Sequence, residues 1–165
     1  MVATQQNSNP KKAIIVAKYF IRKNKEDEKG LDKLKLQKLL YYAQAWNLVI
    51  NKEPLFSEKI EAWIHGPVVP EVWQHFKDID FNNLNCEIPE KEFDVFAEKE
   101  KEVLEEIWQV YGKYDGEYLE VLTHNETPWQ EARRGLADNQ SSQNEISLDS
   151  MQRYYSAKRE VSETK

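Results

Sequence analysis

The sequence predicts a mainly α-helical fold, a compact domain of about six helices with a small β element around residues 59–65. Three observations predict it. Apolar residues recur at three- and four-residue steps in several long segments. Prolines and capping residues stand where such segments begin. Only one stretch alternates with a period of two. We expect residues 10–155 to form a single domain, with flexible polar tails at 1–9 and 156–165.

The first two helices are predicted from apolar periodicity. The first is expected to begin at Pro10, with Ser8 or Asn9 as its cap, and the charged residues 22–30 are expected to form a turn. The second, from about 32 to 50, has the clearest pattern, because one stripe of apolar residues follows helical spacing. That stripe consists of Leu36, Leu39, Leu40, Ala43, Trp46 and Ile50.

The β element rests on the alternation in residues 59–65. Ile60, Ala62 and Ile64 would face one way, and Trp63 and His65 the other. A single strand needs a partner, and residues 84–88 are the candidate. Gly66 and Pro67 are expected to end the strand. Pro70 then opens a short helix that carries Val72, Trp73 and Phe76.

The remaining helices are predicted from proline and capping signals. They cover residues 89–111, 117–124, 127–135 and 147–155, with a polar loop at 136–144. Thr127 is expected to cap the helix that Pro128 opens. Ile146 and Met151 have the spacing of a hydrophobic staple at the start of the last helix.

Charge and cysteine content limit the possible partners. The net charge is −6, which repels phosphate backbones and fits a basic protein partner better than DNA or RNA. Cys86 is the lone cysteine, so no internal disulfide or cysteine-based zinc site is expected, and a reducing compartment is favoured. No apolar run reaches the length of a membrane span, and no signal peptide is apparent. We therefore expect a cytoplasmic protein that is not in the membrane.

A search for catalytic motifs finds none that is complete. The sequence lacks the phosphate-binding and nucleophile-elbow patterns GxxxxGK, GxGxxG and GxSxG. His65, His75 and His124 do not form the HExxH pattern. His124 and Glu126 match half of a zinc-deaminase motif, but its PCxxC half is absent. We expect no enzyme activity, no metal and no cofactor; a hydrolase that uses His65, His124 and Glu126 is a remaining alternative.

Aromatic residues are numerous, with five tryptophans and eight tyrosines. Trp46 and Trp108 follow helical spacing and are expected in the core. Trp63, Trp73 and Trp129 lie beside turns, where either a core or an interface role is open. Such aromatics also leave homo- or hetero-oligomerisation possible.

Two long motifs carry a family resemblance. LQKLLYYAQAW (residues 36–46) followed by EPLFSEKIEAWIHGPVVPEVW (53–73) resembles the Panacea antitoxin domain, a family that includes phage-associated proteins of the GepA and SocA kind. LEVLTHNETPWQEAR (119–133) resembles its second signature, and ISLDSMQRYY (146–155) its closing helix. The resemblance implies a helical antitoxin that neutralises a cognate protein toxin, encoded by an adjacent gene, by direct binding. Some relatives deliver the toxin to a protease, so a proteolytic adaptor with tails as tethers is the alternative.

The resemblance also implies which residues bind the partner or maintain the motif. They are Leu39, Tyr42, Trp63, His65, Gly66, Pro67, Val68, Trp73, Thr123, His124 and Trp129. Partner choice should come from variable loops, for which residues 77–85 and 136–144 are the candidates. We further hypothesise that His65 and His124 lie together and tie the strand to the later helices.

Overall fold

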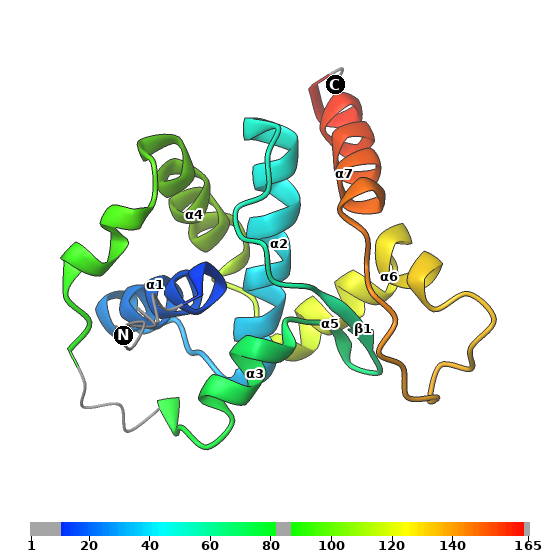
Figure 1. The fold of residues 1–165 in the computed structure, drawn as a ribbon, viewed down its shortest axis with the longest axis horizontal. Coiled ribbons are helices and arrows are strands. Elements are labelled where there is room, and N and C mark those ends of the chain that lie inside the picture. Colours follow the sequence, from blue (N-terminus) through cyan, green and yellow to red (C-terminus); the bar gives the residue numbers. More distant parts are fainter. Residues whose placement is uncertain (1–10, 82–86, 164–165) are drawn as a thin grey trace, which may run out of the picture.

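The computed structural model describes residues 11–81 and 87–163, and its architecture is mainly helical with a small antiparallel sheet (Figure 1). The expected fold class is confirmed. In chain order the elements are α1 (Lys12–Asp27), α2 (Lys33–Asn51), β1 (Glu61–Trp63), β2 (Gly66–Val68), α3 (Pro70–Phe76), the 3-10 helix η2 (Glu90–Val95), α4 (Glu98–Tyr111), α5 (Gly116–His124), α6 (Thr127–Ala132) and α7 (Leu148–Glu163).

Helix α2 is the centre of the molecule, with α1 and α4 on one side and α6 and α7 on the other (Figure 1). It packs against α1, α3, α4, α5, α7 and β2. The Asp32 carboxylate caps it by accepting a hydrogen bond from the backbone N–H of Lys35 at 2.8 Å. Because other elements surround it, its buried surface is much wider than the predicted stripe. Its buried polar residues are Lys35, Gln37, Lys38, Gln44 and Asn47.

Two of these polar side chains fix the turn that follows α2. Gln44 donates from Nε2 to the carbonyl of Phe56 at 2.7 Å and accepts at Oε1 from the N–H of Leu55, also at 2.7 Å. Asn47 donates to the carbonyl of Glu53 at 2.8 Å. Buried backbone groups need such partners, so this turn is held in place by α2 itself.

The first helix differs from the prediction at its C-terminal end. The charged residues expected to form a turn from Arg22 continue α1 to Asp27, because Lys, Arg and Glu are good helix formers and remain at the surface. Glu28 then takes a left-handed conformation, with φ of 51°, and its N–H bonds to the carbonyl of Asn24. The expected cap at Ser8 or Asn9 and the start at Pro10 lie outside the described residues.

The long helix expected at 89–111 is two helices. η2 ends before Phe96, which is extended together with Ala97, and α4 begins at Glu98. The break lets Phe93 and Phe96 both reach the core, where their rings stack 6.4 Å apart. Glu100 restarts the helix by accepting a hydrogen bond from the N–H of Ala97 at 2.9 Å.

The predicted partner of the strand is wrong. β1 pairs with β2 in an antiparallel hairpin in which Ala62 lies opposite Pro67. Its other edge bonds to the segment before α7: the N–H of Ala62 donates to Asn144, and the N–H of Ile146 donates to Ile60, each at 2.8 Å. Both edges of β1 are therefore occupied, which leaves no place for residues 84–88, of which 84–86 lie outside the described part.

The ends of the last two helices also differ from the predictions. Glu126, not Thr127, occupies the cap position of α6, and Thr127 is the first helical residue. The start of α7 agrees with expectation, since the Ser147 hydroxyl accepts from the N–H of Ser150 at 3.0 Å. However, α7 continues to Glu163, so most of the expected flexible tail at 156–165 is helical.

Replacing Gln44 by alanine should destabilise the protein by about 3 kcal/mol, because two buried backbone groups lose their partners. Gln109→Ala, an exposed change on α4, should change the free energy of unfolding by less than about 0.5 kcal/mol. Urea denaturation of both variants measures the difference. Equal stability of the two would show that Gln44 does not hold the turn.

Candidate partner-binding groove at the β-hairpin

A groove with a volume of about 1080 Å³ lies beside the β-hairpin, between the first turns of α2, helices α3 and α5, and the loop after α6. It is larger than the other hollows described below. Its lining residues are Lys33, Leu34, Gln37, Lys38, Trp63, Ile64, His65, Val68, Trp73, Glu117, Glu120, Ser141, Ser142 and Gln143.

Two tryptophans form an apolar wall of this groove. Trp63 on β1 and Trp73 on α3 are both half-buried, and their rings meet edge to face with centroids 6.0 Å apart. The Trp63 indole donates to the Glu61 carboxylate at 2.9 Å, which fixes the ring orientation. Of the three tryptophans left open by the sequence, these two present surface to the groove, whereas Trp129 is in the core.

Lys38 anchors the hairpin from below. Its side chain is fully buried, and its ammonium donates to the carbonyl of Pro67 at 3.1 Å. A Cβ atom at Gly66 would lie 2.5 Å from Lys38 Cε and 3.0 Å from the Thr123 hydroxyl, and Gly66 has φ of +104°. Position 66 therefore requires glycine for both space and conformation. Burial lowers the pKa of Lys38 to about 7, although the Glu120 carboxylate favours its charged form.

Further side chains hold the hairpin from the flanking helices. Gln37 on α2 accepts from the N–H of Val69 at 2.8 Å. Arg133, buried after α6, donates to the carbonyl of Ala62 at 2.9 Å and lies over the Trp129 ring. The Trp129 indole donates to the carbonyl of Trp63 at 2.8 Å. Lys38, Gln37 and Arg133 were not predicted as site residues, although all three lie within the quoted motifs.

The two motif histidines contact the hairpin region through different partners. His65 is exposed at the hairpin turn, and its Nδ1 lies 3.1 Å from the Glu120 carboxylate on α5. His124, at the end of α5, stacks on Trp129 with centroids 3.9 Å apart. Burial lowers the pKa of His124, so its ring is neutral at pH 7. No contact between the two rings is among the described interactions, so their direct pairing stays a hypothesis.

Leu39 and Tyr42 lie away from the groove, in the core. Tyr42 stacks on Tyr111 with centroids 4.1 Å apart and donates to the buried Glu126 carboxylate at 2.6 Å. Tyr155 and Lys158 on α7 each bond to Glu126 at 3.0 Å. This cluster joins α2 to α7, so these motif positions support the fold rather than the groove.

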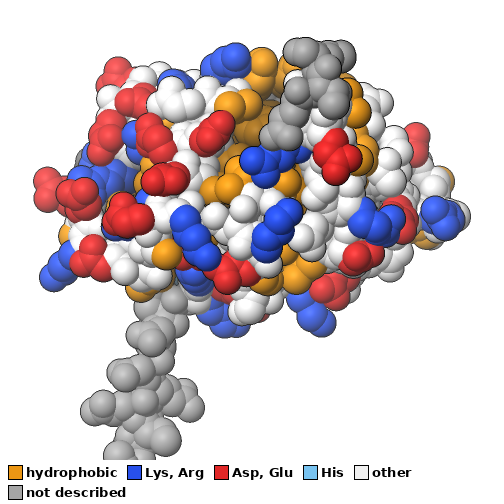
Figure 2. Space-filling model, turned by 90° about the horizontal axis from the view of Figure 1, so that it is seen from above, with side chains coloured by type: hydrophobic (Ala, Val, Ile, Leu, Met, Phe, Trp, Pro, Cys, Tyr) orange, Lys and Arg blue, Asp and Glu red, His pale blue; other side chains and the backbone are white. Residues whose placement is uncertain are grey.

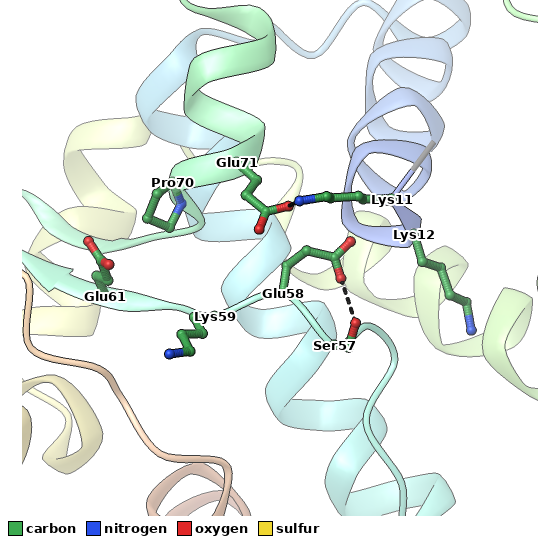
Figure 3. Close-up of a pocket in the computed structure, with 8 residues that line it drawn as sticks. All are labelled: Lys11, Lys12, Ser57, Glu58, Lys59, Glu61, Pro70 and Glu71. Carbon is green, nitrogen blue, oxygen red and sulfur yellow. Dashed lines mark hydrogen bonds and ion pairs between the residues drawn. The ribbon is translucent and has the colours of Figure 1, made fainter. Parts of the chain in front are cut away.

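A second hollow, of about 410 Å³, lies at the start of α1 (Figure 3). Lys11 and Glu71 point toward one another there and form an ion pair at 2.6 Å, whereas Lys12 points away. Glu58 accepts from the N–H of Ala13 at 2.9 Å and so caps α1. These charged groups serve local structure.

A third hollow, of about 380 Å³, lies between α2, α4 and α7. Ile50 and Val110 line it and are exposed, and Trp46 lies half-buried beside them, with its indole bonded to the Tyr111 hydroxyl at 2.9 Å. Figure 2 looks onto the end of the molecule at which α2 and α7 finish, and hydrophobic side chains gather there in a hollow ringed by charges.

Within residues 11–81 and 87–163, no group of three or more His, Cys, Asp or Glu side chains is arranged to hold a metal ion. In the same part of the chain, no helix is both long and apolar enough to cross a membrane.

The geometry and the motifs together define a helical domain with an open groove beside a braced hairpin. The family described as "Antitoxin SocA-like, Panacea domain" matches residues 36–130, which is more than half of the chain. The protein belongs to this antitoxin-like family, as the sequence motifs predicted. All eleven candidate residues lie inside the matched segment. Searches among curated proteins and among solved structures gave no match.

Replacing Gly66 by alanine should destabilise the protein by about 3 kcal/mol or more, since the new methyl group meets Lys38 and the positive φ is strained. Gly135→Ala is the matched control: Gly135 also has a positive φ, +87°, but a Cβ there meets nothing within 4 Å. It should cost only about 1 kcal/mol. Chemical denaturation of both variants tests whether space around Lys38, rather than backbone conformation alone, imposes glycine.

The buried Lys38 should make stability depend on pH. Its pKa is about 7 in the folded protein and 10.5 as the ordinary value, so between these pH values the unfolded chain binds the additional proton. Unfolding free energy should therefore rise by about 2 kcal/mol from pH 7 to pH 9 through this group. Lys38→Met should remove that rise, and Lys33→Met should keep it. An unchanged slope in Lys38→Met would contradict the assignment.

Proposed function

We propose that this protein is an antitoxin that neutralises a cognate protein toxin by direct binding, and that the hairpin groove is the contact surface. The proposal rests on one observation: several residues between 63 and 73, in the second part of the first family motif, surround one open groove. Trp63, His65, Val68 and Trp73 line it, and Gly66 and Pro67 belong to the hairpin that carries Trp63, where Lys38 bonds to Pro67. Half-buried tryptophans that line a preformed groove are typical of interface hot spots.

The position of two loops supports this surface. Ser141, Ser142 and Gln143, from the loop expected to vary, line the groove on one side. On the other side, Lys33 and Leu34 line both the groove and a neighbouring hollow formed with residues 77–81. A fixed hairpin between two loops fits a family in which the partner changes while the fold stays the same.

The contacts of the three residues considered for hydrolysis favour a binding protein over an enzyme. His65 bonds to Glu120, His124 stacks on Trp129, and Glu126 bonds to Tyr42, Tyr155 and Lys158. Of the three, only His65 lines the groove, and none of the described hydrogen bonds joins one of them to another. A nucleophile, base and orienting group in mutual contact would be needed for catalysis.

Co-expression with the product of an adjacent gene tests the proposal. We expect the neighbour to arrest growth alone, and this protein to restore growth and to co-purify with it. Trp73→Ala should weaken the complex by about thirtyfold, roughly 2 kcal/mol, because a central aromatic contact is lost. Val95→Ala, an exposed apolar residue outside the groove, should bind normally.

Other outcomes of that experiment separate the alternatives. A harmless neighbour would contradict the antitoxin assignment. Restored growth without a stable complex, accompanied by a falling level of the neighbour, would favour the proteolytic adaptor. In that case deletion of residues 1–9 should abolish rescue, whereas a direct inhibitor should not need them.

A further inference from the structure

We propose that the groove recognises a basic segment of a protein partner. An apolar side chain of the segment would pack on Trp63 and Trp73, and an arginine or lysine a few residues away would bind Glu117 and Glu120. The inference rests on the proposed function only in taking the toxin as the natural source of that segment.

The carboxylates are placed for a shared cation. Glu117 and Glu120 are one turn apart on α5, so their side chains project from the same helix face onto the groove. Glu117 is exposed, and none of the described residues bonds to its carboxylate. Glu120 is half-buried and contacts His65 through one oxygen, Oε2. Two neighbouring carboxylates suit the planar fork of an arginine better than a single point charge.

The cations that line the groove are directed at backbone carbonyls. The Lys33 ammonium donates to the carbonyl of Lys77, at the C-terminal end of α3. The Lys38 ammonium is buried and donates to Pro67. Lys38 leaves no charge at the open surface, and Lys33 contributes one cation at the edge that the groove shares with the neighbouring hollow, so the two glutamates outweigh it. An acidic segment would meet these carboxylates, which disfavours it.

The tryptophan wall complements this charge. A cation over an indole face gains about 0.5–1 kcal/mol at an exposed site, and the methylene stem of arginine or lysine packs on apolar surface. Trp63 and Trp73 offer such faces beside the glutamates. The net charge of −6 adds a long-range attraction for a basic partner. The two tryptophans, the two glutamates and the net charge therefore all favour a basic segment that also carries an apolar side chain.

Selection from random dodecapeptides displayed on phage, with the purified full-length protein as bait, tests the inference without any knowledge of the toxin. We expect enriched peptides to combine arginine or lysine with an aromatic or aliphatic residue. A peptide enriched in this selection is then synthesised. The double variant Glu117→Gln/Glu120→Gln should bind it at least tenfold more weakly in fluorescence titration. Glu102→Gln, an exposed glutamate on α4, is the control and should bind normally.

Several results would overturn the inference: no enrichment, enrichment of acidic or purely apolar peptides, or equal binding by the double variant. Concentration-dependent self-association that blocks peptide binding would instead identify a second copy as the occupant. The two proposals fail separately. If a toxin complex forms and its affinity is unchanged in the Glu117→Gln/Glu120→Gln variant, only the basic-segment inference fails. If basic peptides bind but the neighbouring gene product is harmless, only the antitoxin proposal falls.

Discussion

The rest of the site depends on one constraint, which is the buried ammonium of Lys38 packed against Gly66. Lys38 extends from the central helix into the space that a side chain at position 66 would occupy, and it bonds to the carbonyl of Pro67. Burying an ammonium is costly unless it finds a partner, so hairpin and helix must stay in register. A shift of the hairpin would leave a buried charge without its acceptor. The positions of Trp63 and His65 on the groove follow from this contact.

The hairpin also depends on elements far away in the sequence. Two strands of three residues each do not form a stable sheet alone. Here the carbonyls of β1 are met by Arg133 and Trp129, and its free edge pairs with residues 144–146. The hairpin thus becomes a rigid support for the groove. Rigid placement lowers the entropy lost when a partner binds, which suits the binding role proposed for this groove.

The family motif divides into two groups with different physical roles. Leu39 and Tyr42 belong to the core, and Tyr42 shares the Glu126 carboxylate with α7. Trp63 and Trp73 border open space, although they belong to the same motif. Sequence similarity alone cannot separate the core residues from the groove residues, because both groups belong to the same family motif. Burial and hydrogen bonding separate them, since the first group is packed in the core and the second lines the groove.

The sequence by itself determined the helical class, the central helix that begins near Asp32, and the motif that bends the chain at Gly66, because these depend on local periodicity and backbone preference. Only the tertiary structure decided the strand pairing, the break before α4 and the burial of Lys38. Phe96 is extended because this conformation buries its ring in the core, and no local sequence signal predicts that burial. The groove likewise combines residues from distant segments, which packing alone brings together.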